Sequence, residues 1–369
     1  MFQRVKNSLN NIPGWHTNRK IIVIESDDWG SIRMPSKKAL QSLTSKGIKT
    51  DNNDNWELDC LESKEDLENL FFILAKYKDT KDKHPVFTFN TVMGNPDFDK
   101  IRKSNFETFY FEHFFDSYKR YYGQDLKKIW EEGIEKGLIK PQFHAREHLN
   151  VSLWLKDLRN GNKNTKVAFD YDFFGLVTET SSINQQHYLA AYRTENFEEL
   201  DFIKNATKEG LDIFKKTFGF RSKTFIACNY VWPKELESFV KSKGISLFQS
   251  QRGQLQPDPN ANGKIKIRRH YTGQENSIGQ IYTVRNVKFE PFENSNIDWI
   301  DQSLSEIQNA FFWHKPAIIS THRINYVGGI NIKHRGRNLK LLDQLLQRIL
   351  IKWPDVEFLS SDQLVSIIK

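Results

Sequence analysis

Cysteine and long apolar runs are scarce in this sequence of 369 residues. Its two cysteines, Cys60 and Cys228, exclude a disulfide scaffold and a Cys-based structural zinc site. No apolar run approaches the ~20 residues that span a bilayer. The N-terminal segment MFQRVKNSLNNIPGW has no apolar core of the kind found in signal peptides. We therefore expect a protein of a reducing compartment, most simply the cytoplasm.

The composition is that of a globular protein with a large core. Hydrophobic residues make up 38% and charged residues 27%, which excludes a low-complexity or disordered chain. The formal net charge of +8 permits an anionic partner without demanding one. The sequence contains no nucleic-acid-binding motif, no Gly-rich phosphate loop and no Gly-x-Ser-x-Gly nucleophile elbow. Aromatic residues are abundant, at 13%.

Short apolar runs alternate with longer helical patterns along the chain. The expected strands are Lys20–Glu25, Pro85–Thr91, Pro141–His144, Lys223–Cys228, Ile245–Ser250, Pro316–Thr321 and Val356–Leu359. Helices are expected after the capping-box sequence Ser63–Asp66 and over Gln124–Gly137, Asn196–Phe218, Lys234–Lys243, Ile297–Trp313 and Arg337–Lys352. This alternation predicts an α/β protein, a distorted (β/α) barrel of about seven parallel strands.

We expect one domain over residues 1–369, enlarged by insertions near 50–84, 92–140, 155–195 and 251–296. The run Gln256-Pro-Asp-Pro-Asn260 cannot form a central strand or a helix. Insertions of this kind would build the rim of a groove.

Unusual polar residues follow several of the expected strands. Asp27 and Asp28 end the first strand, His144 ends the third and precedes His148, and His322 ends the Pro316 strand. Because the carboxyl ends of parallel strands meet at one face of a barrel, we expect these side chains to cluster there. Each has a simpler explanation by itself, such as a helix N-cap for the Asp pair or core packing for a histidine. Their common position after strands favours a functional site over these separate structural roles.

This set of residue types suits a divalent metal ion. His144 and His148 are four positions apart, close together on a helix or a tight turn, and one carboxylate, Asp27 or Asp28, would complete a three-ligand site. Three protein ligands leave a position for water, as in catalytic sites. The remaining Asp would then act as a base.

At these residues the sequence resembles the polysaccharide deacetylase family, also known as carbohydrate esterase family four or the chitooligosaccharide-deacetylase homology domain, and its divergent bacterial members above all. Its Asp-Asp, His-x-x-x-His and strand-His motifs are similar to IIVIESDDWG, HAREH and AIISTHR here. The resemblance implies Asp27 as general base and His322 as general acid. It also implies a metal, usually zinc, held by Asp28, His144 and His148.

The resemblance further implies an oxyanion donor after the third-motif strand, in TFIACNYVW. We expect it at the backbone N–H of Tyr230, beside Asn229. The family's base-orienting Arg is missing here, and Arg146 or Arg323 could replace it unless both are solvated surface residues. The family's fourth motif has no clear counterpart, because Asp298 lies at an expected helix start.

Aromatic residues near the proposed site could line a saccharide groove, since sugar C–H faces pack on rings. Trp29 and Tyr230 are the candidates, and for Trp232 core packing is an equal alternative. The expected function is metal-dependent removal of N- or O-linked acetyl groups from a saccharide or polysaccharide precursor. The alternatives are a non-catalytic saccharide-binding scaffold on the same fold, motivated by the missing Arg, and a glycoside hydrolase that uses Asp27 and another carboxylate.

Overall fold

In the computed structural model of the protein, residues 8, 10–50, 55–178 and 187–368 are described. Parts of two expected insertions, residues 51–54 and 179–186, and most of the first nine residues lie outside the described residues.

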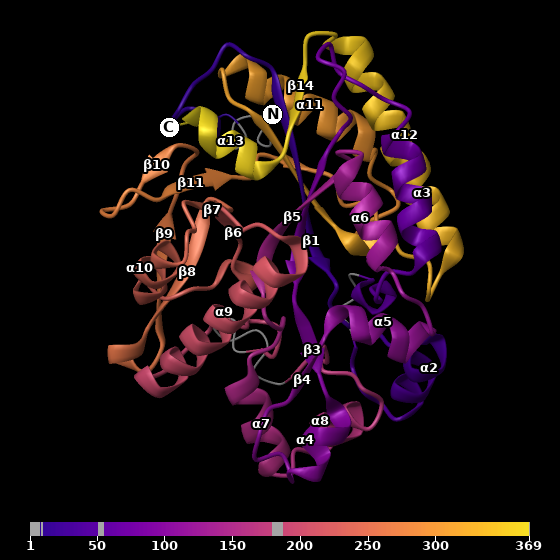
Figure 1. The fold of residues 1–369 in the computed structure, drawn as a ribbon, viewed down its shortest axis with the longest axis vertical. Coiled ribbons are helices and arrows are strands. Elements are labelled where there is room, and N and C mark those ends of the chain that lie inside the picture. The colour runs from indigo at the N-terminus through magenta and orange to yellow at the C-terminus, as the bar shows by residue number, and fades with distance from the viewer. Residues whose placement is uncertain (1–7, 9, 51–54, 179–186, 369) are drawn as a thin grey trace.

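A curled ten-stranded sheet forms the centre of the molecule (Figure 1). Its strands run in the spatial order β10 (Gln274–Glu275), β11 (Ile281–Val284), β7 (Leu247–Ser250), β6 (Thr224–Phe225), β5 (Ile139–Ala145), β2 (Phe87–Val92), β1 (Ile21–Trp29), β13 (Ala317–His322) and β12 (Val287–Lys288), with β14 (Glu357–Leu359) beside β1. All pairs are parallel except β10 with β11. This sheet is the distorted (β/α) barrel that the sequence predicts.

Helices cover the sheet and form a lobe at one end of it. They are α2 (Lys37–Ser45), α3 (Lys64–Leu74), α4 (Phe98–Lys103), α5 (Phe114–Tyr122), α6 (Lys127–Glu135), α7 (Val151–Arg159), α8 (Lys163–Phe169), α9 (Phe197–Phe218), α10 (Glu235–Ser242), α11 (Trp299–Phe312), α12 (Ile332–Lys352) and α13 (Ser361–Ile368). α3 packs between α6 and α12 along one flank (Figure 1). No helix in the described part of the chain is long and apolar enough to cross a bilayer.

All seven expected strands and all six expected helices are present, with boundaries that differ by a few residues. The capping box at the start of α3 forms as predicted, since the Ser63 and Asp66 side chains each bond the other's backbone N–H. The Lys223 strand is much shorter than expected, because the chain leaves the sheet after Phe225 and enters a 3-10 turn at Cys228–Tyr230.

The segment 251–296, expected as an insertion, contributes three strands to the main sheet. β10, β11 and β12 have only two to four residues each, too few to show a period in the sequence. The same segment also forms a hairpin of β8 (Gly253–Asp258) and β9 (Lys264–Arg269) outside the main sheet. The Pro-rich run at 256–260 is therefore absent from the central strands, as predicted, although its last two residues enter a short 3-10 helix over Pro259–Ala261.

A second hydrophobic cluster lies beyond the carboxyl ends of the central strands. It joins α2, α4, α7 and α8, and its large buried members include Phe98, Trp154 and Phe169. Nearby, β3 (Gly94–Pro96) and β4 (Phe111–His113) form a small ladder (Figure 1). Segments 92–140 and 155–195 thus build a lobe beside the strand ends that carry the predicted site.

Candidate active site

A bulge at the end of β1 turns two adjacent carboxylates toward one site. Neighbouring side chains of a regular strand point to opposite faces. Here Ser26 pairs with Phe89 and Trp29 pairs with Thr91 on β2, so β1 carries one extra residue. Asp28 takes a left-handed conformation, with φ of 76°. The bulge therefore brings Asp27 and Asp28 into one cavity.

A second bulge places His144. On β5, Phe143 pairs with Thr91 and Ala145 pairs with Val92, which leaves His144 as the extra residue. His148 lies in the turn between β5 and α7, so the His-x-x-x-His motif spans a strand end and a turn.

Asp28, His144 and His148 converge as the sequence predicts. The Oδ1 atom of Asp28 lies 3.5 Å from His144 Nε2 and 3.3 Å from His148 Nε2, and all three residues are buried. His144 Nδ1 bonds the Ile226 carbonyl at 2.8 Å, which directs Nε2 toward Asp28. Arg33 donates to the other oxygen of Asp28, Oδ2, at 3.1 Å. Asp28 is thus held with one oxygen free to face the histidines.

The surrounding charges affect the protonation of each of these three groups. Burial alone would raise the pKa of Asp28, but the neighbouring guanidinium of Arg33, above all, outweighs it and holds the pKa well below its usual value. Burial and Arg33 lower the pKa of His148, which favours the neutral imidazole that binds metals. Burial would also lower the pKa of His144, yet the neighbouring Cys228 and Asp28 raise it well above its usual value. One carboxylate oxygen and two imidazole nitrogens fit a divalent metal ion such as zinc.

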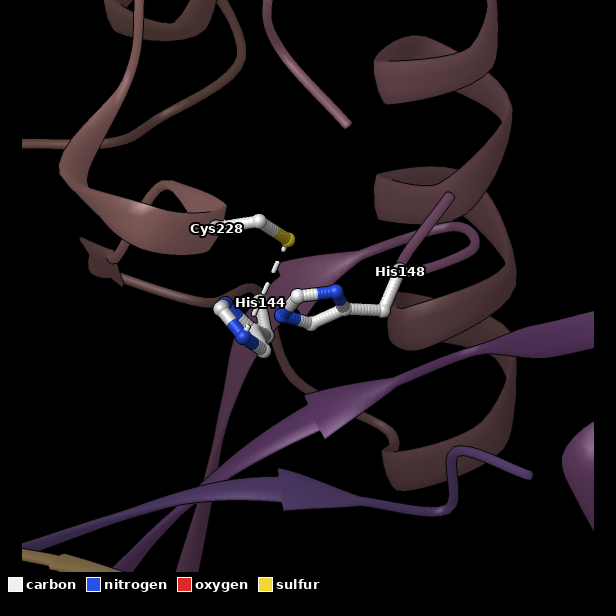
Figure 2. A group of neighbouring side chains, drawn as sticks. All are labelled: His144, His148 and Cys228. Carbon is white, nitrogen blue, oxygen red and sulfur yellow. Dashed lines mark hydrogen bonds between the residues drawn. The ribbon is translucent and has the colours of Figure 1, made fainter. Parts of the chain in front are cut away.

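Cys228 is the additional neighbour of this cluster (Figure 2). Its Sγ lies 3.8 Å from His144 Nε2, and the ligand atoms of His144, His148 and Cys228 lie within 4.8 Å of one another. The thiol is fully buried, and its side chain points toward the two imidazole rings.

Asp27 is held by a guanidinium that no sequence motif indicates. Arg285 donates from Nη1 to Asp27 Oδ2 at 2.6 Å and from Nη2 to Oδ1 at 2.7 Å, and Asn90 donates to Oδ1 at 2.7 Å. Burial alone would raise the pKa of Asp27, but Arg285 outweighs it and lowers the pKa to about 2. Arg285 also donates from Nε to Glu25 at 2.7 Å, which fixes its plane.

The expectation that Arg146 or Arg323 orients Asp27 is wrong. Arg146 pairs with Glu147 and Glu209, and its guanidinium lies over the Phe111 ring. Arg323 is fully buried and pairs with Asp59 and Glu62. Asp59 also pairs with Arg33, which bonds Asp28. Neither is a solvated surface residue. Arg285 follows the four-residue strand β11, and this strand was the signal that sequence reasoning missed.

His322 lies on the other side of Asp27. Its Nε2 is 3.6 Å from Asp27 Oδ2, and its Nδ1 bonds Glu290 Oε1 at 2.7 Å. Burial alone would lower the pKa of His322, but Glu290 and Asp27 outweigh it and raise the pKa to about 9. Glu290 was also missed. Asp298 instead caps α11, where its side chain accepts from the N–H groups of Ile300 and Asp301.

The turn after β6 shapes another wall of the cavity. The backbone N–H of Tyr230 donates to the Ala227 carbonyl at 2.9 Å, so it is not free to bind an oxyanion, and that expectation is wrong. The Tyr230 hydroxyl instead accepts from Arg285 at 3.1 Å. Asn229 is exposed, lines the cavity and has a φ of 57°.

Trp29 and Trp232 do not line a saccharide groove. Trp29 is 1% exposed and stacks on Phe89 with ring centroids 3.6 Å apart, and Trp232 is fully buried against Phe248. Both belong to the core. The tryptophan at the site is Trp56, which lines the cavity and meets the His322 ring edge to face at 5.2 Å.

The predicted catalytic and metal-binding residues line a cavity of about 470 Å³ together with residues of several surrounding segments. Its floor contains Asp27, Asp28, His144, His148 and His322. Its walls include Trp56 from the segment 50–84 and Leu176, Val177, His187 and Leu189 from the segment 155–195. Residues of the segments 50–84 and 155–195 thus contribute to the lining of the cavity.

No family model matches the sequence, and no curated protein matches it. Solved structures are similar over most of the chain. A candidate glycoside hydrolase/deacetylase from Parabacteroides distasonis is 9% identical, with a TM-score of 0.49 over 96% of this chain and 72% of that one. A candidate polysaccharide deacetylase from Pseudomonas aeruginosa is 9% identical, with a TM-score of 0.47 over 95% and 91%. A 4-alpha-glucanotransferase from Thermococcus litoralis is 8% identical, with a TM-score of 0.46 over 94% and 40%. At such low identities and TM-scores these similarities carry no argument about activity.

Proposed function

We propose that this protein is a metal-dependent hydrolase that removes acetyl groups, N- or O-linked, from a saccharide or polysaccharide precursor. The observation that carries the proposal is the convergence of Asp28 Oδ1, His144 Nε2 and His148 Nε2 beside the pair of Asp27 and His322. Asp28 and the two histidines would hold the ion. When bound, such an ion lowers the pKa of water and polarises a carbonyl group.

Asp27 would take the proton of the attacking water. Its Oδ2 accepts one hydrogen bond from Arg285, whereas Oδ1 accepts two, from Arg285 and Asn90, so Oδ2 is the freer oxygen. Because the pKa of Asp27 is about 2, Asp27 stays ionised but is a weak base. A base this weak would take a proton only from a water whose pKa the bound ion lowers.

His322 would protonate the leaving amine or alkoxide. Its raised pKa, about 9, keeps the imidazolium protonated at neutral pH, and Glu290 fixes the ring through Nδ1. Asn229, which is exposed and lines the cavity, would donate to the oxyanion in place of the Tyr230 N–H.

Arg285 also bears on the alternative of a non-catalytic scaffold. That alternative rests on the missing base-orienting Arg. Arg285 bonds both oxygens of Asp27, which supports the hypothesis of an active enzyme.

The test combines metal content with acetate release. Purified protein should take up one zinc ion per chain and release acetate from acetylated chitooligosaccharides or acetylated xylan. Asp27→Asn should keep the zinc and lose the activity, while His148→Ala should lose both. His314→Asn, at an exposed histidine, is the matched control and should change neither.

Two outcomes would overturn the proposal. One is a protein that binds no stoichiometric metal and releases no acetate with zinc, cobalt or nickel. The other is metal-independent cleavage of a glycosidic bond, which would establish the glycoside hydrolase alternative.

A further inference from the structure

We propose that Cys228 is a fourth protein ligand of the metal site, and that its thiolate binds the same ion as His144 and His148. The inference rests on the metal dependence proposed above. A sequence with two cysteines excludes a zinc site built mainly from thiolates, but it leaves room for one thiolate among imidazole and carboxylate ligands.

The distances between donor atoms support this assignment. In a tetrahedral zinc site with Zn–N of ~2.0–2.1 Å and Zn–S of ~2.3 Å, a nitrogen and a sulfur ligand lie ~3.5 Å apart. Cys228 Sγ lies 3.8 Å from His144 Nε2. The oxygen of Asp28 lies 3.3 and 3.5 Å from the two imidazole nitrogens, also close to the ~3.3 Å edge expected between N and O ligands.

The backbone directs the sulfur inward. The 3-10 turn that begins at Cys228 is closed by two hydrogen bonds, from Tyr230 N to Ala227 O at 2.9 Å and from Val231 N to Cys228 O at 3.2 Å. Within it, Cys228 is fully buried and the next residue, Asn229, is exposed. Figure 2 shows the thiol pointing from this turn toward both imidazole rings.

The sulfur lies on the protein side of the site. His144, His148 and Asp28 line the cavity, whereas Cys228 is buried behind its wall, between Ala227 and Asn229, which do line it. A thiolate at this place would leave the cavity side of the ion open to water and substrate. A water on that side would be a fifth ligand, a coordination number that catalytic zinc sites reach in the transition state, so four protein ligands do not by themselves exclude catalysis.

A simpler interpretation treats Cys228 as a buried apolar residue with a weak S–H bond to His144. The two interpretations differ in the metal ion that the site would prefer and in the absorption spectrum that bound cobalt would show. A thiolate is a soft ligand and favours zinc or cobalt over magnesium or manganese, and the thiol proton leaves to the buffer when the metal binds. Without the sulfur, a site of Asp28 and two histidines would discriminate less strongly between these metal ions.

The experiment uses the full chain loaded with cobalt. Cobalt bound by a thiolate shows a sulfur-to-metal charge-transfer band in the near ultraviolet. We expect this band in the wild type and in the matched control Cys60→Ala, which alters the other buried cysteine. We expect Cys228→Ser to lose the band, to keep one cobalt per chain and to bind it at least about tenfold more weakly.

Each outcome decides the inference. A wild-type protein that binds one cobalt without the band overturns thiolate ligation and leaves the proposed function intact. A band that persists in Cys228→Ser also overturns it. If neither wild type nor variant binds cobalt, the proposed function fails together with the inference. If Cys228→Ser does not fold, Cys228→Ala replaces it, and a band that persists in Cys60→Ala still assigns the thiolate to Cys228.

Discussion

Arg285 donates to both carboxylate oxygens of Asp27, at 2.6 and 2.7 Å, although the two residues are 258 positions apart in the chain. The fork of a guanidinium matches the two oxygens of a carboxylate, so this contact fixes the orientation of Asp27 as well as its charge. Arg285 is a positioning residue, since it acts on the reaction through Asp27.

Replacing Arg285 with Lys should therefore lower kcat more than it changes KM. A lysine keeps the charge but cannot bond both oxygens. We expect kcat to fall about 10- to 100-fold, as for other supporting contacts, with zinc content unchanged. The pKa of Asp27 should rise from about 2, which moves the acidic limb of the pH–rate profile upward. Arg348→Lys, at an exposed pair with Asp301, is the control. An unchanged kcat together with an unmoved acidic limb would contradict the role.

The pair of Glu290 and His322 predicts a pH dependence on the alkaline side. His322 has a pKa of about 9, so the proton donor is present below this pH and is lost above it. In Glu290→Gln the pKa should fall, and the alkaline limb of the activity should move to lower pH. NMR titration of the His322 ring measures the shift directly. Glu293→Gln, at a more exposed pair with Lys288, should leave the titration unchanged.

The same pair should contribute to folding stability with a defined sign. Because the folded pKa of His322 is raised above its usual 6.5, its contribution is fully present below pH 6.5 and is lost as the pH rises through about 9. Urea unfolding at these pH values should show the loss in the wild type and a smaller loss in Glu290→Gln. Equal losses in both proteins would contradict the assignment.

Trp56 should contribute to substrate binding. Its ring lines the cavity and meets His322, where a sugar face could pack on it. Trp56→Ala should raise KM for an acetylated oligosaccharide several-fold while kcat changes less, and Trp56→Phe should recover part of the affinity. Steady-state kinetics over a series of oligosaccharide lengths measures this. A KM that is unchanged at every length would contradict it.

Trp29 should behave as a core residue, in contrast to Trp56. Its ring is 1% exposed and stacked on Phe89, so Trp29→Ala leaves a cavity and should cost about 3–5 kcal/mol of unfolding free energy. Urea denaturation measures this cost. A variant of wild-type stability that has lost only saccharide affinity would instead support the groove role that the sequence suggested.

Arg323 should affect stability more than catalysis. It is fully buried between Asp59 and Glu62, and its removal leaves Glu62 without its ion-pair partner and Asp59 with Arg33 alone, 3.5 Å away. Arg323→Met should cost about 3–5 kcal/mol, and Asp59→Asn combined with Glu62→Gln should recover part of it. At equal folded fractions, its kcat should fall less than that of Arg285→Lys. A larger fall would place Arg323 in the site.

Much of the fold could be predicted from the sequence, because the signals are local. Buried strands such as Lys20–Glu25 read as short apolar runs, and the helices read from their apolar period and from caps such as Ser63. The convergence of Asp28, His144 and His148 could also be predicted, since each follows a strand and parallel strands end at one face. The sequence by itself thus determined the α/β architecture and which polar residues meet at the strand ends.

Only the tertiary structure decided which residues support the polar residues of the site. Arg285 and Glu290 follow strands of two to four residues, which exist because neighbouring strands pair with them and which leave no periodic trace. The bulges at Asp28 and His144 arise where β1, β2 and β5 lose register, a property of pairs of strands. The orientation of Cys228 and the burial of Trp29 likewise depend on what packs around them, since a residue type alone does not state which way its side chain points.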